Sequence, residues 1–423
     1  MSRPARRPSR LAQLSPDVVL AGVVLALVSF GLVMVYSASS AVAALSDGNP
    51  SGIALRQAMA AVLGVGAYLL MSRVSPAALQ RFARPAMIVS VVLLLLVFLP
   101  GLGTAANGSR RWLALGALQI QPSELAKLAV VLWIAAAVAS RPGRVRERDG
   151  LVPFLAVVAV PALLILVEPD LGTAVVVLVA AGAMLVVAGA RPAHLGLAAV
   201  GASLLAGIAI LTADYRRERL LAFIDPWSDP GGAGFQSVQA QLALGSGGIS
   251  GTGVGDGLQK AFYLPEAHTD MILATVGEEL GLIGVTAVLA AFVLFAIAGY
   301  RVALRAADLH QQLLAAGVTT LVTTQAVVNV GAVVGLMPVT GVPLPFVSYG
   351  GTSLVVVLAS AGLLVNVARR SPDARRRLRV VPGEGGHRRG RDRGTRRAGA
   401  GGGRGAVAAG GRGELRGGTA GRR

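Results

Sequence analysis

Apolar runs of about 20 residues recur along most of this chain, and short segments that carry charges separate them. A helical run of that length crosses a hydrocarbon core of about 30 Å. The pattern predicts membrane-spanning helices near residues 18–40, 53–72, 82–100, 122–140, 151–168, 171–190, 193–212, 270–299, 309–336 and 349–368. The predicted fold class is therefore an all-α polytopic membrane protein with about ten transmembrane helices and one long loop after the seventh.

Arginine residues gather in every second connection between the predicted spans. The N-terminal tail and the alternate connections contain Arg3, Arg6, Arg7, Arg10, Arg73, Arg81, Arg84, Arg141, Arg144, Arg146, Arg148, Arg191, Arg301 and Arg305. Lys and Arg mark the cytoplasmic side of a membrane protein, so we expect both termini and these connections to be cytoplasmic. The chain then divides into a cytoplasmic tail over 1–17, a membrane domain over 18–370 with an extracytoplasmic loop over 213–269, and a cytoplasmic tail over 371–423.

The C-terminal segment 369–423 is a Gly/Arg low-complexity sequence. It contains 17 arginines and four acidic residues, so it carries most of the net charge of +18. It has almost no apolar side chains to bury, which predicts a disordered, solvated tail, with contact to anionic lipid or RNA as the alternative. The absence of cysteine excludes disulfides, thiol catalysis and cysteine metal sites, and the four histidines form no HExxH pattern.

The connection 213–269 is far longer than most loops, which indicates either a functional loop or disorder. Two segments within it, RRERLLAFIDPW and FQSVQAQLAL, have the apolar spacing of helices and flank a turn at DPGGAG. The segment GSGGISGTGVGDG offers backbone N–H groups that suit phosphate, but it matches no nucleotide-binding motif. A flexible linker is the simpler interpretation of this glycine-rich segment.

Several ionisable side chains lie within or at the ends of the predicted spans, where charge is costly and commonly functional. Glu124 and Lys127 are three residues apart on one helical face. They fit either a structural ion pair that ties two helices or a ligand site. Glu168 and Asp170 lie in a tight turn, where Asp170 fits either a cap of the next helix or a ligand contact.

The stretch YLPEAHTDMILATVGEE leads into the eighth span and carries four acidic residues. We expect Thr269 to cap this helix and Asp270 to lie in its first turn. Glu278 lies about 12 Å further along the helix, and we expect Glu278 and Glu279 to face protein, water or a cation. Capping accounts for Asp270 alone and leaves the rest of this acidic cluster unexplained.

Other polar groups complete the pattern. Gln325 and Asn329 are four residues apart in the ninth span and are expected to hydrogen-bond a neighbouring helix. PVTGVPLPFVSYGGTSL places irregular backbone at membrane depth, which is tolerated only inside protein or beside a wet cavity. Arg110 and Arg111 lie on the side where basic residues are rare, and an anionic ligand would account for them. Together these groups predict an outward-opening charged cavity for a ligand with an anionic head and a long apolar tail.

These segments resemble the SEDS family, named for shape, elongation, division and sporulation. The matches occur in family order: VYSASS at 35–40, GSRRWLALGALQIQPSELAKL at 108–128, EPDLGTA at 168–174, RRERLLAFIDPW, QLALGSGGISGTGVG, YLPEAHTDMILATVGEELGLIG and VPLPFVSYGGTSL. They extend over about residues 18–370, and the wording AHTD favours the division members of the family over the elongation members.

The resemblance implies a ten-helix peptidoglycan glycosyltransferase that polymerises lipid II, an undecaprenyl-diphosphate-linked disaccharide peptide, at the outer face of a bacterial cytoplasmic membrane. It implies that Asp270 of the HTD motif is catalytic. The expected partners are a class B penicillin-binding protein, other division proteins and membrane lipid. We expect the substrate to be bound by Glu124, Lys127, Asp170, Arg110, Arg111, His268 and Ser348.

The residues suit this chemistry. A general base must deprotonate the acceptor hydroxyl, and cations must stabilise the departing diphosphate. Asp270 is the expected base, and the candidates for the diphosphate are Arg110, Arg111, Lys127 and Arg216–Arg219. A divalent cation, Mg²⁺ or Mn²⁺, held by carboxylates is compatible with the reaction, although the sequence identifies no metal ligands.

Two other functions are compatible with the sequence. A charged intramembrane cavity also suits a transporter that flips lipid II, and the deeper polar groups Glu278, Glu279, Gln325 and Asn329 would serve it. Most polar groups lie toward the outer side instead, which favours the polymerase. A non-enzymatic division scaffold is the third interpretation, and it predicts that Asp270 is dispensable.

Overall fold

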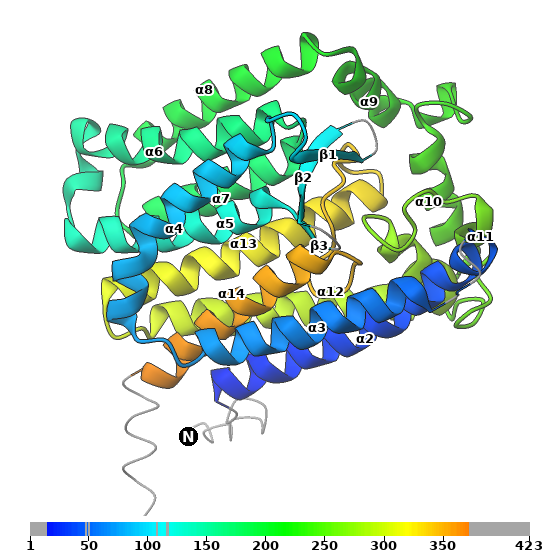
Figure 1. Ribbon diagram of the computed structural model, residues 1–423, viewed down its shortest axis with the longest axis horizontal. Coiled ribbons are helices and arrows are strands. Elements are labelled where there is room, and N and C mark those ends of the chain that lie inside the picture. The colour runs from blue at the N-terminus through cyan, green and yellow to red at the C-terminus, as the bar shows by residue number, and fades with distance from the viewer. Residues whose placement is uncertain (1–14, 47–48, 50, 107–108, 116–117, 372–423) are drawn as a thin grey trace, which may run out of the picture. The chain divides into compact units, whose positions relative to one another are not determined.

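The structure is a computed structural model that describes residues 15–46, 49, 51–106, 109–115 and 118–371. The predicted spans correspond to long helices in this part of the chain (Figure 1): α2 (Pro16–Ser46), α3 (Gly52–Met71), α4 (Pro76–Leu96), α5 (Pro122–Ser140), α6 (Arg148–Val167), α7 (Leu171–Val187), α8 (Pro192–Leu211), α12 (Ile272–Leu304), α13 (Leu309–Val333) and α14 (Gly351–Arg370). Among the described residues, nine of these helices are long and apolar enough to cross a membrane, and α7 is apolar but has 17 residues. The predicted all-α polytopic fold is confirmed.

The C-terminal tail is not part of the described structure. The chain divides into two units, Met1–Val380 and Val381–Arg423, and the second unit lies wholly outside the described residues. The predicted disorder of the Gly/Arg tail therefore stays a prediction, as does the state of the N-terminal tail before residue 15.

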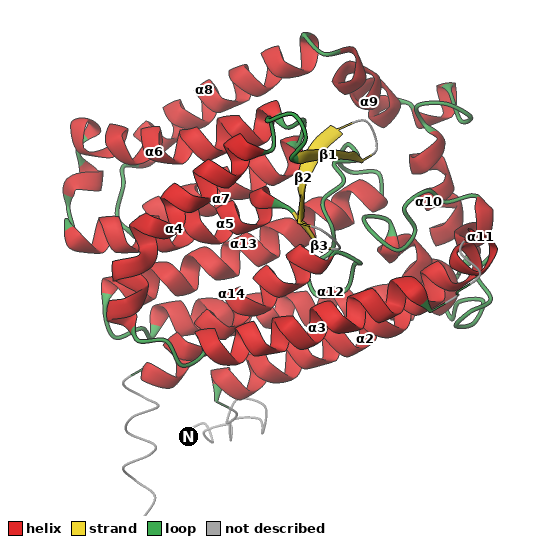
Figure 2. Cartoon of the chain, viewed as in Figure 1, coloured by secondary structure: helices red, strands yellow, loops and turns green. Residues whose placement is uncertain are grey.

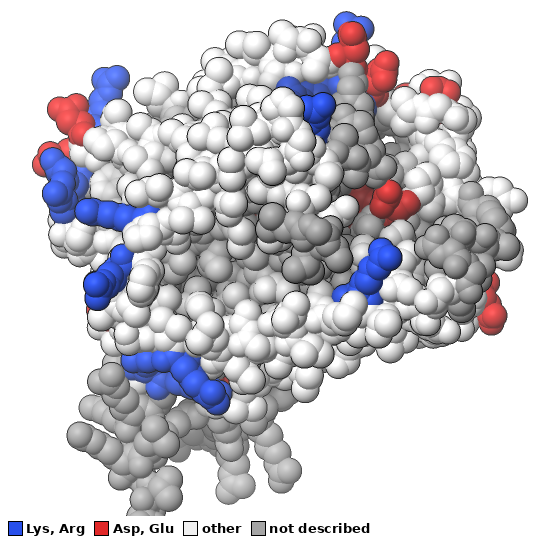
Figure 3. Space-filling view, viewed as in Figure 1, with Lys and Arg blue, Asp and Glu red and all other residues white. Residues whose placement is uncertain are grey.

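The long helices lie side by side, and the segments that interrupt them gather at one end (Figure 2). These segments are three strands and the elements of the long connection. The start of α2 and the end of α14 lie near each other, away from the end of the bundle that carries these segments (Figure 1). On the face shown in Figure 3, charged side chains lie toward these two ends and the broad middle is almost uncharged. Such a distribution is expected where lipid covers the middle of the molecule.

Two helices form the centre of the bundle and one lies at its edge. α14 packs against α3, α13 and α2, and α13 packs against α12, α7 and α5. A Cβ atom on Gly362 of α14 would lie 2.3 Å from the carbonyl oxygen of Tyr68 on α3, so a glycine is needed for this close approach. The edge helix α8 has no buried residue, so its surface is left to lipid.

A three-stranded antiparallel sheet lies between α4 and α5, and the sequence analysis did not predict it. Its strands are β1 (Gly103–Ala106), β2 (Ser109–Leu115) and β3 (Leu118–Ile120), in the order β1-β2-β3. Thr104 pairs with Trp112, and Leu113 pairs with Ile120. Strands of three to seven residues are too short to show a clear alternation of apolar and polar positions.

Two helix starts differ from the prediction. α4 begins at Pro76 because Ser75 Oγ accepts a hydrogen bond from Ala78 N at 3.2 Å, so Arg81 and Arg84 lie in this helix rather than in the connection before it. The predicted cap of α12 by Thr269 is wrong, because the residue that precedes this helix is Met271 and no side chain caps it. Asp270 therefore lies before α12 rather than in its first turn.

The connection 213–269 is folded. It contains α9 (Asp214–Ile224), the 3₁₀ turn η2 (Pro226–Ser228), α10 (Phe235–Ser246) and α11 (Gln259–Phe262). The two predicted helical segments are thus confirmed as α9 and α10. The predicted turn between them is confirmed too, and Asp229 Oδ2 accepts a hydrogen bond from Ala233 N at 3.0 Å within it.

The glycine-rich segment 245–257 is neither a flexible linker nor a phosphate nest. It packs on a break in α12 at Gly281, whose φ of 62° and ψ of −160° are not helical. A Cβ atom on Gly247 would lie 1.8 Å from the carbonyl oxygen of Gly277, and one on Gly251 would lie 2.1 Å from that of Glu279. The part of α12 after the break, 282–304, is still about 35 Å long and can cross a membrane.

Candidate functional site

Asp270 lies in the turn that leads into α12, and its side chain is partly exposed. The hydroxyl of Thr269 lies 3.3 Å from Asp270 Oδ1 and 2.8 Å from Glu266 Oε2, between the two carboxylates. Asn329 of α13 donates from Nδ2 to the carbonyl oxygens of Asp270, at 2.7 Å, and of Val342, at 2.8 Å. This amide fixes the backbone of Asp270 against α13 and the connection that follows it.

The surroundings of Asp270 favour its neutral form. Burial and the nearby Glu266 carboxylate raise the pKa of Asp270 from 3.8 to about 6, while hydrogen bonds from its own backbone and from Thr269 and the charge of Arg219 act in the opposite direction. At neutral pH the carboxylate is mostly ionised, and its pKa is close to the pH at which a general base is most effective. Burial lowers the pKa of the neighbouring His268, which favours a neutral imidazole.

His268 lies against the connection between α13 and α14, and Ser348 is part of that connection. The ring of His268 packs on that of Tyr349 with centroids 5.4 Å apart, and Tyr349 N donates to the carbonyl oxygen of His268 at 2.9 Å. Ser348 is buried, and its Oγ accepts a hydrogen bond from Leu344 N at 2.7 Å. The structure therefore gives Ser348 a role in shaping this connection, and its contact with a substrate stays a prediction.

Glu124 and Lys127 form a buried ion pair. The Nζ of Lys127 lies 2.8 Å from Glu124 Oε1, and each side chain is 1% exposed. Lys127 also donates to Gln325 Oε1 on α13 at 2.7 Å, and Gln325 Nε2 donates to the carbonyl oxygen of Pro343 at 2.9 Å. The pair thus ties α5 to α13. Through Gln325 it is also connected to Pro343, next to Val342, which Asn329 contacts. The predicted structural ion pair is confirmed, and so is the predicted hydrogen bond of Gln325 to a neighbouring helix. The same prediction for Asn329 is wrong, because its amide contacts the turn at Asp270 and the connection at Val342.

The turn between α6 and α7 gathers two carboxylates and one arginine. Asp170 Oδ1 accepts a hydrogen bond from Thr173 N at 3.1 Å, so the predicted cap is confirmed. Arg111 of β2 donates to the carbonyl oxygens of Glu168 and Pro169, which fastens the sheet to this turn. Glu168 is fully buried, and burial followed by the charge of Asp170 raises its pKa to about 8. The predicted diphosphate ligand Arg110 is exposed at the neighbouring position.

A mainly apolar cavity of about 200 Å³ lies between α7, α8, α9 and α13. Its apolar lining includes Leu171, Val175, Ile210, Leu220, Val328 and Val339. Arg216 and Arg219 of α9 also line it, and Arg219 Nη1 donates to the carbonyl oxygen of Val339 at 3.0 Å. Arg219 also lowers the pKa of Asp270 through its charge, so the electrostatic field of this cavity residue extends to the carboxylate. The arrangement suits a ligand with an apolar chain and an anionic group.

Comparison with known proteins identifies the family. Residues 18–372 match the family model described as "Cell cycle protein" and named for FtsW, RodA and SpoVE. The chain belongs to this family. The resemblance to the SEDS proteins, which was inferred from the motifs, is thereby confirmed over the predicted extent.

Members of the family with curated names are similar over most of their length. The chain is 43% identical to the "Probable peptidoglycan glycosyltransferase FtsW" of Geobacter metallireducens over 356 residues, which cover 84% of this chain and 95% of that protein. It is 42% identical to the "Stage V sporulation protein E" of Bacillus subtilis over 361 residues, which cover 84% of this chain and 97% of that protein.

Solved structures of the family agree with the fold. One is a chain of a peptidoglycan synthase complex whose structure is described as showing the coordination of polymerization and crosslinking. It matches with a TM-score of 0.68 and 33% identity over 83% of this chain and 96% of that chain. The rod shape determining protein RodA of Thermus thermophilus matches with a TM-score of 0.62 and 30% identity over 84% of this chain and 96% of that chain.

Ser37, in the segment VYSASS, and Lys260, which lies between two of the matching segments, join a buried polar cluster that the sequence analysis did not predict. Lys260 of α11 is 4% exposed and pairs with Glu279, which is fully buried. The available signal was composition, because the chain has two lysines among 39 basic residues. Both lysines, Lys127 and Lys260, are buried partners of a glutamate.

Proposed function

We propose that the protein is a peptidoglycan glycosyltransferase that polymerises lipid II at the outer face of the bacterial cytoplasmic membrane during cell division. The observation that carries the proposal is Asp270, an ionisable carboxylate whose raised pKa is about 6 and whose backbone carbonyl oxygen Asn329 of α13 holds, and α13 also lines the apolar cavity that contains Arg216 and Arg219. The names of the curated relatives support the activity. The apolar helices make the protein a multi-pass membrane protein.

The geometry suggests how the chain's residues serve the transfer. The Asp270 carboxylate accepts the proton of the acceptor sugar hydroxyl as its oxygen attacks the anomeric carbon of the donor sugar. The bond from that carbon to the diphosphate breaks, and the polyprenyl diphosphate leaves with the electron pair. Arg219 and Arg216 stabilise its negative charge, while the apolar wall accepts part of the lipid chain. Glu124, Lys127, Asp170, Arg110 and Arg111 are further proposed substrate contacts.

The proposed partners are a class B penicillin-binding protein that crosslinks the new glycan and other division proteins at the septum. The match to a chain of a peptidoglycan synthase complex supports the first of these. Among the described residues, no three His, Cys, Asp or Glu side chains come together to hold a metal ion. A Mg²⁺ or Mn²⁺ ion in this site would therefore take most of its oxygen ligands from the diphosphate and water.

Reconstitution tests the activity. The full chain, purified with its partner synthase and supplied with lipid II, should form glycan strands that a gel resolves by length. A transporter of lipid II would form none. The deeper polar groups that would have served transport, Glu278, Glu279, Gln325 and Asn329, all make hydrogen bonds within the protein, so no observation favours that alternative.

We expect the connection 213–269 to be extracytoplasmic and the Arg-rich connections to be cytoplasmic, because basic residues mark the cytoplasmic side. Ser228→Cys and Ser140→Cys place thiols at exposed positions in this cysteine-free chain. An impermeant maleimide should label residue 228 in intact cells and residue 140 only after permeabilisation. Labelling of residue 140 but not 228 in intact cells would invert the proposed topology.

The rate of polymerisation should fall as the pH is lowered through about 6. A general base acts in its ionised form, so protonation of Asp270 below its raised pKa removes activity roughly tenfold per pH unit. Glu266→Gln removes a negative charge that raises this pKa, so the acid limb of kcat/KM should move to lower pH. Glu147→Gln changes an exposed acid that directly precedes α6, and it should leave the profile unchanged. An unmoved limb in Glu266→Gln would exclude Asp270 as its source.

A further inference from the structure

The break in α12 divides this helix into a short first part, 272–280, and the long spanning part. At Gly281 the helical hydrogen-bond ladder is interrupted, which leaves carbonyl and N–H groups that need partners. The glycine-rich segment supplies them. Thr252 N donates to the carbonyl oxygen of Glu278 and Gly253 N to that of Glu279, each at 3.0 Å, while Leu282 N donates to the carbonyl oxygen of Gly248 at 2.9 Å. The break is therefore a fully supported feature of the fold.

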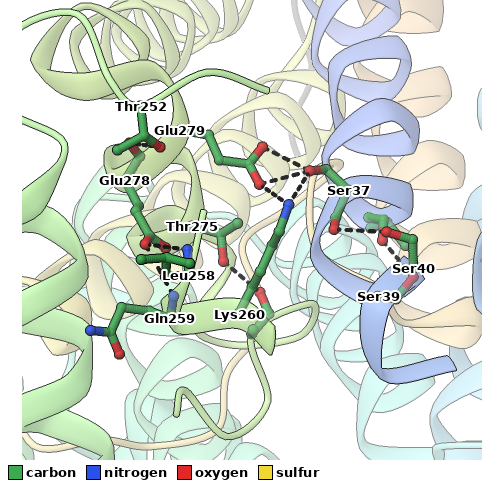
Figure 4. Close-up of polar contacts among 12 residues, drawn as sticks. Ser37, Ser39, Ser40, Thr252, Leu258, Gln259, Lys260, Thr275, Glu278 and Glu279 are labelled. Atoms are coloured by element: carbon green, nitrogen blue, oxygen red, sulfur yellow. Dashed lines mark hydrogen bonds and ion pairs between the residues drawn. The ribbon is translucent and has the colours of Figure 1, made fainter. Parts of the chain in front are cut away.

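Two glutamates immediately before the break hold the small helix α11. Glu278 Oε1 accepts hydrogen bonds from Leu258 N at 2.7 Å and from Gln259 N at 3.0 Å, at the start of α11. Glu279 pairs with Lys260 in the same helix. Figure 4 shows the Glu278 carboxylate beside Leu258 and Gln259, and the Glu279 carboxylate between Ser37 and the end of the Lys260 side chain. Both acids of the GEE motif thus fix one four-residue helix rather than a ligand.

The pair also reaches α2. Ser37 Oγ lies 2.7 Å and 2.8 Å from the two carboxylate oxygens of Glu279, and Lys260 Nζ lies 3.0 Å from Ser37 Oγ (Figure 4). The exposed fractions are 5% for Ser37, 4% for Lys260 and 0% for Glu279. Water is therefore nearly excluded from the cluster, and each charge depends on its partner.

The two charged residues of this cluster, Lys260 and Glu279, lie on either side of Asp270 along the chain. The Lys260–Glu279 contact closes the segment 260–279 into a loop, and Asp270 lies at the middle of that loop. The tip of the loop is held separately, by Asn329 on the carbonyl oxygen of Asp270 and by Tyr349 N on that of His268. The Lys260–Glu279 ion pair thus holds the two ends of the loop together, and Ser37 connects these ends to α2.

We propose that Lys260 is a positioning residue for the transfer reaction: its pair with Glu279 closes the segment 260–279 onto α2 and holds Asp270 where a reacting hydroxyl meets it. The inference rests on the proposed function, since it assigns a role within that same site. Because Lys260 is not among the residues that line the cavity, we expect its loss to change the turnover of bound substrate rather than substrate binding.

A variant series separates positioning from stability. Lys260→Met should lower kcat for glycan formation about 10–100-fold with KM for lipid II unchanged within about twofold, since small misplacements of a reacting group have effects of this size. Lys260→Met combined with Glu279→Gln removes both charges, so its thermal midpoint should return toward that of the wild type while kcat stays low. Lys260→Arg should recover most of the activity. Arg369→Met, which breaks a surface ion pair with Asp17, is the matched control and should change neither quantity.

Amide hydrogen exchange gives a readout that does not depend on activity. Exchange in the segment 260–279 should accelerate in the double variant, while α5 and α13 stay protected. A double variant that regains both its thermal midpoint and its kcat would overturn the positioning role, as would a change confined to KM. If exchange in 260–279 is faster in the double variant but the wild-type protein makes no glycan, the proposed function is overturned. The structural role of the Lys260–Glu279 pair in holding this segment would then still stand.

Discussion

Asp270→Asn should lower the rate of glycan polymerisation by about 10²–10⁴-fold and leave the protein folded and bound to its partner synthase. Asparagine has nearly the same shape as aspartate, and its Oδ1 still accepts the hydrogen bond from Thr269. The backbone carbonyl that Asn329 holds is unaffected. Only the capacity to take up a proton is lost, so the loss of rate measures the role of the general base.

The measurement is gel-resolved glycan formed from lipid II by matched amounts of each variant. Asp229→Asn is a suitable control, because it is the same substitution in the same connection and keeps the side-chain oxygen that Ala233 N contacts. This control should keep wild-type activity. If Asp270→Asn retains more than about a tenth of the wild-type rate, Asp270 is not the general base of the reaction.

The helical part of the fold was predictable because membrane spans depend on a single strong signal. The run predicted over 151–168, which corresponds to α6, needs only its length and hydropathy to be identified. The ends of helices depend on local chemistry instead. Ser75 and Pro76 mark the start of α4 clearly in the structure, yet the arginines at 81 and 84 suggested a connection. Thr269 is likewise a residue type that often caps helices, but the N-cap position of α12 is occupied by Met271.

The candidate site was predictable as a set of residue types but not as a set of contacts. Glu124 and Lys127 are neighbours along one helix, so their pairing follows from spacing alone. The partners of Glu279 lie 19 and 242 residues away, and no local pattern brings Lys260 and Ser37 to it. The glycine-rich segment was misjudged for the same reason, because its glycines permit close packing on Gly281 rather than flexibility.

Removal of either Glu124 or Lys127 alone should destabilise the protein by about 3–5 kcal/mol, because each leaves the other as an uncompensated buried charge. Lys127→Met has the larger structural consequence, since Lys127 also contacts Gln325, and Glu124 Oε2 already lacks a hydrogen-bond partner among the described residues. The double variant Glu124→Gln with Lys127→Met removes both charges and keeps similar volumes, so most of the lost stability should return.

Thermal unfolding in detergent, with folded yield as a second readout, tests the coupling of this pair. Arg217→Met, which removes an exposed ion pair with Asp214, is the control.

The two roles of Lys127 predict different results. If it ties α5 to α13, the single variants unfold at lower temperature and the double variant regains both stability and turnover. If it binds the diphosphate, Lys127→Met folds with normal yield and KM for lipid II rises, because a cation that stabilises the ligand has been lost. Normal stability together with normal turnover in both single variants would remove the pair from the site and contradict the buried geometry.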